Sequence, residues 1–484
     1  MREMVRTHLK SRFAPNLVSR GLFIFYLLTV LTAVLPYGAV RQIPLSLLAG
    51  LVCITGLAAL LIEGTPSGGK WLFNCILAAE GLVVVWVLVQ IYLFLPGFAV
   101  GIDFGTAHAA GTNSAISVER SDSLSTIINL ATPGVTFLTG LIILTNDDRR
   151  RLLVSCLTIG GGVFALYGIV QLLVFPRTNL FSDKVAYIDS VTATFVNRNS
   201  AGTLLGIVCL AAVRQVWTLL PQVRAILANR SLITQRVRDD WLLQRFCLFL
   251  IVLALATIAL LLTKSRGAVA STGIALVVLS VLLKLSTPTE FAGTSQITQG
   301  LRRRLFVATI TSVFVVSIAI SAFGGRVLLR AESQTQGDSR FCVLPGMLQT
   351  ASEHPIVGFG AGTFRYAYAP NRDPSCGIYF IWDRAHNVYL EGWITLGAIF
   401  FVIFGMAAGA LVFCHIVGLR TRRRMCSYPA LGLASILLVA IHSMVDFSVQ
   451  IAGVSTFFSA LLAATSAISL GRRSPDGRDV SDAA

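Results

Sequence analysis

Charged residues are scarce in this chain of 484 residues. Only 13% are Asp, Glu, Lys or Arg, whereas 55% are hydrophobic, and soluble domains carry roughly 25% charge. The sequence has no CxxC pair, no HExxH and no serine nucleophile elbow, which excludes sites with those signatures. It also lacks internal repeats, low-complexity tracts and a soluble second domain. These absences leave a polytopic membrane protein as the predicted class.

Twelve apolar stretches are long enough to cross roughly 30 Å of hydrocarbon. They start near Gly21, Ile43, Trp71, Thr126, Leu152, Ala201, Phe246, Ala268, Leu305, Val388, Ala430 and Ile451. The first lacks a convincing cleavage site, so we expect a retained anchor. The predicted fold is all-α with about 12 transmembrane helices. A single transmembrane domain spans residues 21–470, between an N-terminal segment (1–20) and a tail (471–484).

The net charge of +16 comes from short basic clusters between the spans, which favours membrane topology over nucleic-acid binding. If the N-terminus is cytoplasmic, every dense basic cluster falls on the cytoplasmic side, as the positive-inside rule requires. Both termini are therefore predicted to be cytoplasmic. Three outer segments are long, at 96–125, 176–196 and 324–387, and the last is a large loop between spans 9 and 10.

Cysteine usage gives no metal-binding pattern. Seven of the nine cysteines lie in or beside apolar runs and are interpreted as packing residues. Cys342 and Cys376 fall in the longest outer loop, where an oxidising compartment could pair them. The sequence leaves that pairing open.

Basic residues on the outer side depart from the charge rule. Lys264 and Arg266 lie in TKSRGA, at a tight outer hairpin. They either extend their charge to lipid headgroups or bind an anion, since a guanidinium matches phosphate oxygens. Arg198 lies between Asn197 and Asn199, where the sixth predicted span begins. These side chains either cap a helix or, with the helix N-terminus, bind a phosphate group.

The long outer loop carries a candidate general base. His386 and its neighbour Asn387 lie where this loop meets an apolar run, and a neutral imidazole can accept a proton from a sugar hydroxyl near pH 7. A structural histidine is the alternative. In the same loop, Gly358, Gly360 and Gly362 indicate a tight turn in preference to a phosphate cradle. Further anion-binding capacity comes from Arg340, Arg365, Arg372 and Arg384.

A second polar group lies near the end of the eleventh predicted span. His442 and Asp446 are ionisable residues in an apolar context, which is typical of functional or packing networks. We interpret them as structural support, with Asp446 a possible partner of an outer arginine. Glu80 lies inside the third span without an assigned role. No paired carboxylates occur on the outer side, so no divalent metal is expected.

Four stretches resemble the O-antigen ligase and polymerase family of bacterial inner-membrane proteins. They are FVNRNSAGTLL, LTKSRGA, the pair PIVGFGAGTF with AHNVYLEGWITLG, and HSMVDFSVQ. They occur in the family's order and cover roughly the C-terminal 60% of the chain. The resemblance implies a GT-C-like architecture and a metal-independent, inverting glycosyltransferase without a cofactor, whose site faces the periplasm.

The implied reaction transfers a glycan from undecaprenyl pyrophosphate to an acceptor hydroxyl. By resemblance, Arg198 and Arg266 would bind the donor pyrophosphate, and His386 would activate the acceptor. Asn197, Asn199, Asn387, Lys264, His442 and Asp446 would support them. The acceptor would be lipid A-core or a growing polysaccharide, and membrane lipids are the other expected partners.

One position departs from the family's ligase pattern. That pattern has a GxxG pair after the histidine, whereas here Phe400 takes the place of the second glycine, three residues after Gly397. A ligase is favoured, and a polymerase of O-antigen or exopolysaccharide stays open. A transporter or flippase of lipid-linked sugars is the alternative from another class. That alternative would place functional charges through the depth of the membrane, whereas here they gather at the outer side.

Overall fold

The computed structural model describes residues 2–66, 68–93, 115–180, 182–228, 236–285, 342–376, 381–422 and 425–471. The span predicted near Leu305 lies outside these residues, as do Arg340 and residues 324–341 of the long loop.

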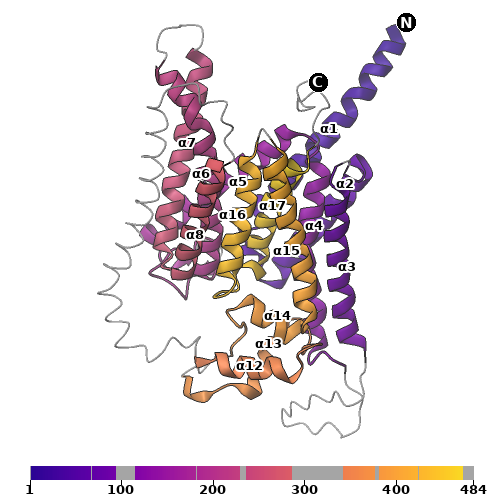
Figure 1. The fold of residues 1–484 in the computed structure, drawn as a ribbon, viewed down its shortest axis with the longest axis vertical. Coiled ribbons are helices and arrows are strands. Elements are labelled where there is room, and N and C mark those ends of the chain that lie inside the picture. The colour runs from indigo at the N-terminus through magenta and orange to yellow at the C-terminus, as the bar shows by residue number, and fades with distance from the viewer. Residues whose placement is uncertain are drawn as a thin grey trace.

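The described chain is almost entirely helical (Figure 1). Its long helices are α1 (Arg2–Thr32), α2 (Gln42–Glu63), α3 (Lys70–Tyr92), α4 (Arg120–Ile143), α5 (Asp147–Val174), α6 (Arg198–Ala228), α7 (Arg236–Leu262), α8 (Arg266–Leu285), α15 (Ile399–Thr421), α16 (Ser427–His442) and α17 (Ala452–Ser469). Shorter pieces are η1 (Tyr37–Ala39), α12 (Leu344–Glu353), α13 (Phe364–Ala367), η4 (Ala369–Asn371), η5 (Pro374–Cys376), α14 (Val388–Leu396) and η6 (Ser448–Gln450). Strands β1 (Thr178–Asn179) and β2 (Ser182–Asp183) form one small antiparallel hairpin.

Nine helices among the described residues are long and apolar enough to cross a membrane, and two further apolar helices are shorter, at Leu17–Thr32 and Ser427–His442. The predicted all-α polytopic membrane fold is therefore confirmed. The count of twelve spans stays a prediction, because one of them lies outside the described residues.

Helix α17 forms the centre of the bundle. Almost every residue of α17 is buried, and it packs against α4, α5, α15 and α16. Its sequence, AGVSTFFSALLAATSAIS, is rich in Ala, Ser, Gly and Thr, and small side chains let helix backbones approach closely. A Cβ atom added at Gly140 of α4 would lie only 2.6 Å from the Ala463 Cβ atom, which shows how tight this contact is.

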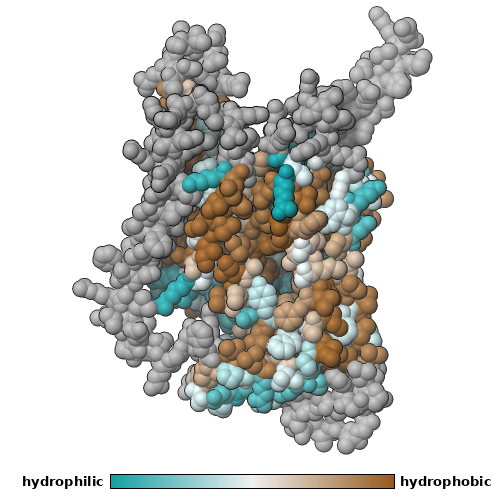
Figure 2. Space-filling model, viewed as in Figure 1, coloured by the Kyte–Doolittle hydropathy of each residue, from teal (hydrophilic) through white to brown (hydrophobic). Residues whose placement is uncertain are grey.

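The outer surface of the bundle is apolar. Large hydrophobic side chains such as Ile43, Leu61 and Val402 are well exposed, as expected for helices that face lipid. Figure 2 shows a broad hydrophobic surface over the bundle, with hydrophilic side chains gathered along the lower margin where α12 lies. We call this end, which carries α12, α13 and α14, the loop end (Figure 1).

The apolar run that begins at Val388 is broken into two helices. Gly397 separates α14 from α15 with a φ of 73°, and a Cβ atom there would lie 2.0 Å from the Ile356 carbonyl oxygen. A side chain is therefore sterically excluded, and the chain turns at this glycine. The sequence predicts one long span here, with its first turns at the interface, whereas the structure has a separate short helix.

Asp147 is one of the few buried charged residues in the described chain. It is buried at the start of α5, where Arg150 Nη1 lies 2.6 Å from its Oδ1 atom. Negative charge is favourable in the first turn of a helix. The Asn146 side chain caps the same helix by accepting from the Arg149 N–H.

Candidate active site at the loop end

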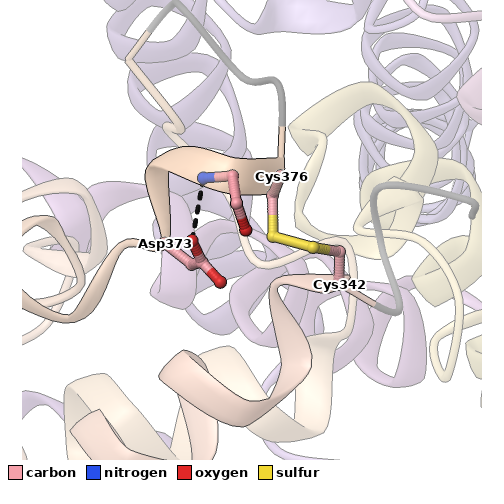
Figure 3. The surroundings of a disulfide bond; sticks show 4 residues. Cys342, Asp373 and Cys376 are labelled. Carbon is pink, nitrogen blue, oxygen red and sulfur yellow. Dashed lines mark hydrogen bonds between the residues drawn. A yellow bond between two sulfur atoms is a disulfide. The ribbon is translucent and has the colours of Figure 1, made fainter. Parts of the chain in front are cut away.

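The loop end has its own small hydrophobic core, built around Met347, Phe359, Phe364, Tyr368 and Ile394. A disulfide closes this region. It joins Cys342 to Cys376 with a Cα–Cα distance of 5.7 Å (Figure 3). The pairing that the sequence left open is therefore present.

Asp373 lies beside this disulfide and accepts a hydrogen bond from the Ser375 N–H at 2.8 Å (Figure 3). Together with Cys342 and Cys376 it forms the one cluster of potential metal ligands among the described residues. Both sulfur atoms are committed to the disulfide, so neither is a thiolate. The cluster does not fit a metal site.

The alternating glycines form a turn and not a phosphate cradle. Gly358, Gly360 and Gly362 all have positive φ. The N–H groups of Phe359 and Gly360 donate to the carbonyls of Ile394 and Thr395 in α14. A Cβ atom at Gly358 would lie 2.5 Å from the Thr395 carbonyl oxygen. These N–H groups are already used to join the turn to α14, which confirms the tight-turn interpretation.

Asn387 caps α14. Its Oδ1 atom accepts hydrogen bonds from the Tyr389 and Leu390 N–H groups, both at 3.0 Å. The next N–H, of Val388, donates to the Ser443 carbonyl just after α16. The Asn387 side chain thus fixes the start of α14 and with it the adjacent His386.

His386 lies in a left-handed backbone conformation, with a φ of 54°. Non-glycine residues seldom adopt this region, which costs of order 1–3 kcal/mol and is found at functional sites. Its ring packs edge-on against Trp382 at 5.5 Å and Phe447 at 5.0 Å between centroids. The side chain is 25% exposed, so the imidazole is held in place yet still accessible.

The buried partner of His386 is Asp446. The His386 Nδ1 atom lies 3.8 Å from the Asp446 Oδ2 atom, which is longer than a hydrogen bond. Asn199 donates its Nδ2–H to the same carboxylate oxygen at 2.5 Å, and Ser448 Oγ donates to the other. The hydrogen bond from Asn199 joins α6 to the turn between α16 and α17.

The charge state of Asp446 follows from these contacts. Burial disfavours the carboxylate, but the nearby His386, the hydrogen bond from Ser448, an electrostatic interaction with His442 and the hydrogen bond from Asn199 outweigh burial and hold the pKa of Asp446 below its usual range. Asp446 is therefore ionised at neutral pH, where it can stabilise a positive charge on His386.

His442 links a third helix to this group. It is buried, and its Nδ1 atom lies 2.7 Å from Thr203 Oγ1 of α6. A Cβ atom on Gly267 of α8 would lie 3.2 Å from the His442 Nε2 atom. The starts of α6 and α8 therefore meet the end of α16 here. The expected supporting role of His442 agrees with this position and stays a prediction.

Arg198 is the first residue of α6 and is half-buried, with its guanidinium 5.1 Å from the centre of the Tyr187 ring. Asn197 caps the helix by accepting from the Asn199 N–H at 2.8 Å. Within the described chain Arg198 has neither an ion-pair nor a hydrogen-bond partner for its side chain. The structure thus contains both features weighed from the sequence, a capped helix start and, beside it, a cation that has no ion pair but is near enough to Asp189 to interact with it electrostatically.

Arg266 begins α8 and is exposed. Like Arg198, its side chain pairs with no acid in the part of the chain that the structure describes. Lys264 differs, because its Nζ atom lies 2.6 Å from Oδ2 of the exposed Asp189. The hairpin therefore presents one compensated and one uncompensated cation.

Sequence reasoning missed Glu391. This buried carboxylate accepts from Arg384 Nη1 at 3.0 Å and from the Ala385 N–H at 2.8 Å. It fixes the segment that leads into His386, and it uses a charge of Arg384 that we had counted as anion-binding capacity. A carboxylate in the first turn of an apolar helix was the available signal.

Glu80 lies apart from this site, in α3. Its carboxyl group packs against Gly134 of α4, where a Cβ atom would lie 1.8 Å from Oε1. The Oε2 atom is buried without a hydrogen-bond partner in the described chain. This position gives Glu80 no described contact with the loop-end residues.

A family model matches a part of the chain that includes some of these residues. Residues 251–405 match the family model described as O-antigen ligase, a segment that includes Arg266, His386 and Asn387. No curated protein matches the chain. The matched domain indicates ligase- or polymerase-type activity in general. Over this segment the chain is similar to the O-antigen ligase family, which supports the resemblance seen in LTKSRGA and in the pair PIVGFGAGTF with AHNVYLEGWITLG; the stretches FVNRNSAGTLL and HSMVDFSVQ lie outside the matched residues.

Proposed function

We propose that this protein is an inverting glycosyltransferase that moves a glycan from undecaprenyl pyrophosphate to a hydroxyl of lipid A-core, at the periplasmic face of the bacterial inner membrane. The observation that carries the proposal is the contact chain at the loop end. Asp446 binds Asn199, the neighbour of Arg198, and also lies beside His386. A candidate base thus lies beside one buried carboxylate, and the residue next to a candidate pyrophosphate ligand is hydrogen-bonded to that carboxylate.

The proposed donor site uses Arg198 and Arg266. Each begins a helix, where unpaired N–H groups and the helix dipole favour an anion. Each guanidinium also lacks an acidic partner in the described chain, so its charge is available. Two such cations match the pyrophosphate, and they would stabilise the negative charge that develops as the pyrophosphate leaves. No metal is required for that charge neutralisation.

The proposed chemistry is a single displacement. The acceptor oxygen forms a bond to the anomeric carbon while the bond from that carbon to the pyrophosphate oxygen breaks, and undecaprenyl pyrophosphate leaves with the electron pair. His386 takes the proton of the acceptor hydroxyl. The ionised Asp446, 3.8 Å away, stabilises the resulting imidazolium. Attack opposite to the leaving group inverts the anomeric configuration.

A gel of surface polysaccharide from a strain that lacks the protein tests this function. Loss of the lipid A-linked ladder, with accumulation of long polymer on the lipid carrier, supports the ligase. Accumulation of single repeat units contradicts the ligase and identifies a polymerase. An unchanged ladder contradicts both. Complementation with His386→Ala then separates loss of the site from loss of the protein.

A further inference from the structure

A cavity of about 320 Å³ lies at the loop end, beside the candidate active site. Its walls include Arg365, Tyr366, Tyr368, Arg372 and Trp382. This volume falls at the lower end of the range of small-molecule sites. Trp382 belongs to both places, because it lines the cavity and packs edge-on against His386 at 5.5 Å between ring centroids.

The chemistry of the walls points to a sugar. Tyr366, Tyr368 and Trp382 offer aromatic rings with a polar atom at one edge, which suits a ligand with apolar C–H faces and hydroxyl groups. The Tyr368 hydroxyl and the Trp382 Nε1–H are buried and have no hydrogen-bond partner in the described chain. Buried polar groups are normally paired, and a rotation of either ring toward the cavity would let the hydroxyls of a bound sugar pair these two.

The charge of the walls points to an acidic sugar. Arg365 is compensated, since its Nη2 atom lies 2.8 Å from Asp122 Oδ2. Arg372 has no ion-pair or hydrogen-bond partner for its side chain in the described residues, and its neighbour Asp373 accepts from Ser375 instead. A partly buried guanidinium of this kind binds carboxylate or phosphate with charge-assisted hydrogen bonds.

The cavity is held in shape by covalent structure. Tyr368 and Arg372 lie within the segment closed by the Cys342–Cys376 disulfide. The Tyr368 ring stacks on Phe364 at 5.5 Å between centroids. The backbone of the wall that carries Tyr368 and Arg372 is therefore constrained before a ligand arrives.

We propose that this cavity binds an acidic sugar unit, one that bears a carboxylate or phosphate, of the acceptor glycan. Binding there would hold the acceptor next to His386, through the shared wall at Trp382. The inference that the cavity binds an acidic sugar depends only on the residues that line it. The assignment of this sugar to the acceptor rests on the proposed function.

A binding experiment on the full-length protein in detergent tests the cavity without any transfer reaction. The probes are α-1,4-linked trigalacturonate, neutral maltotriose and inorganic phosphate, titrated by tryptophan fluorescence. We expect trigalacturonate to bind most tightly, and about tenfold or more weaker in Arg372→Gln, as loss of one charge-assisted hydrogen bond predicts. Trp382→Phe should remove most of the signal. The matched control is Arg177→Gln, an exposed arginine of another loop.

Equal binding of trigalacturonate by wild type and Arg372→Gln would overturn the proposal, and so would equal binding of the acidic and neutral trisaccharides. Tight binding of phosphate alone, unaffected by Tyr368→Phe, would also overturn the sugar assignment. Tyr368→Phe removes a single hydroxyl, so it keeps the test valid if Arg372→Gln fails to elute as a folded, monodisperse protein.

A transfer assay with purified lipid A-core then separates the two sources of the sugar. A KM for lipid A-core that rises in Arg372→Gln, with kcat nearly unchanged, supports the acceptor assignment. A KM that rises only for the lipid-linked donor overturns it. His386→Ala should abolish transfer and still bind trigalacturonate. If His386→Ala transfers normally, the proposed function fails while the binding result stands by itself.

Discussion

The His386 Nδ1 atom and the Asp446 Oδ2 atom lie 3.8 Å apart, and only the imidazole is accessible. Asn199 donates a hydrogen bond to the same carboxylate oxygen. This geometry gives a neutral imidazole no hydrogen bond to the carboxylate, but it gives an imidazolium an ion-pair partner within 4 Å. The pair is thus better matched to the protonated state that follows proton transfer than to the state that precedes it.

His386→Ala should lower glycan transfer by about 10²–10⁴-fold, the range typical of a lost general base. The measurement is the transfer rate of the purified protein, with the amount in the membrane checked by immunoblot. The matched control is His354→Gln, which changes another loop-end histidine, packed on Phe359, and should leave transfer nearly unchanged. A similar loss in both variants would indicate general damage to the loop end.

Asp446→Asn should destabilise the protein by an amount that does not shrink as the pH falls from 8 to 5. The pKa of Asp446 is lowered in the folded state, so its stabilising contribution is fully present above the unfolded value of about 3.9 and is lost only as the pH falls below that value. Melting temperatures of both proteins across this range provide the check. A difference that narrows between pH 8 and 5 would contradict an ionised Asp446.

Arg198→Gln and Arg266→Gln should each lower kcat by about 10²–10³-fold, the usual cost of removing one group that stabilises a developing negative charge. Lys264→Gln should lower it less, because Asp189 already compensates that charge. Arg177→Gln provides the control for a lost surface cation. The rates are measured at saturating donor, so that a change in donor affinity alone does not contribute. Unchanged rates in both arginine variants would refute their role at the pyrophosphate.

Gly358→Ala should lower the melting temperature by several degrees and open the loop end to protease. The residue has a φ of 69°, and the new Cβ atom would lie 2.5 Å from the Thr395 carbonyl oxygen. Strained backbone of this kind costs about 1–3 kcal/mol, before the steric clash is added. Gly409→Ala in α15 is the control, because no atom lies within 4 Å of its Cβ position and alanine favours a helix by up to about 1 kcal/mol. Equal melting temperatures for both variants would count against the tight turn.

Most of the fold could be predicted from local sequence alone. A membrane-spanning helix satisfies its backbone hydrogen bonds within one segment, so an apolar run such as the one near Ile43 is enough to predict α2. The break at Gly397 could not be found in this way. It is imposed by the Ile356 carbonyl, which comes from a loop 41 residues earlier and is brought there only by the tertiary structure.

The sequence predicts which residues belong to the candidate site, but not which of them contact one another. His386, Arg198 and Asp446 were each marked by a polar side chain at the edge of an apolar run. The hydrogen bond between Asn199 and Asp446 joins positions 247 apart in the chain, and no local pattern indicates such a pair. Trp382 and Asp189 were missed for the same reason, since an isolated aromatic or acidic residue in a polar loop is unremarkable until its neighbours are known.

The disulfide between Cys342 and Cys376 has a consequence for the order of assembly. Spans can insert into a membrane as the chain is made, but this cross-link needs an oxidant, which the periplasm that we propose for the loop end supplies and the cytosol does not. A newly inserted protein would thus carry its helices before it carries a finished cavity wall at Tyr368 and Arg372. Oxidation would be the last step in its maturation, and reducing growth conditions would produce inserted but incompletely assembled molecules.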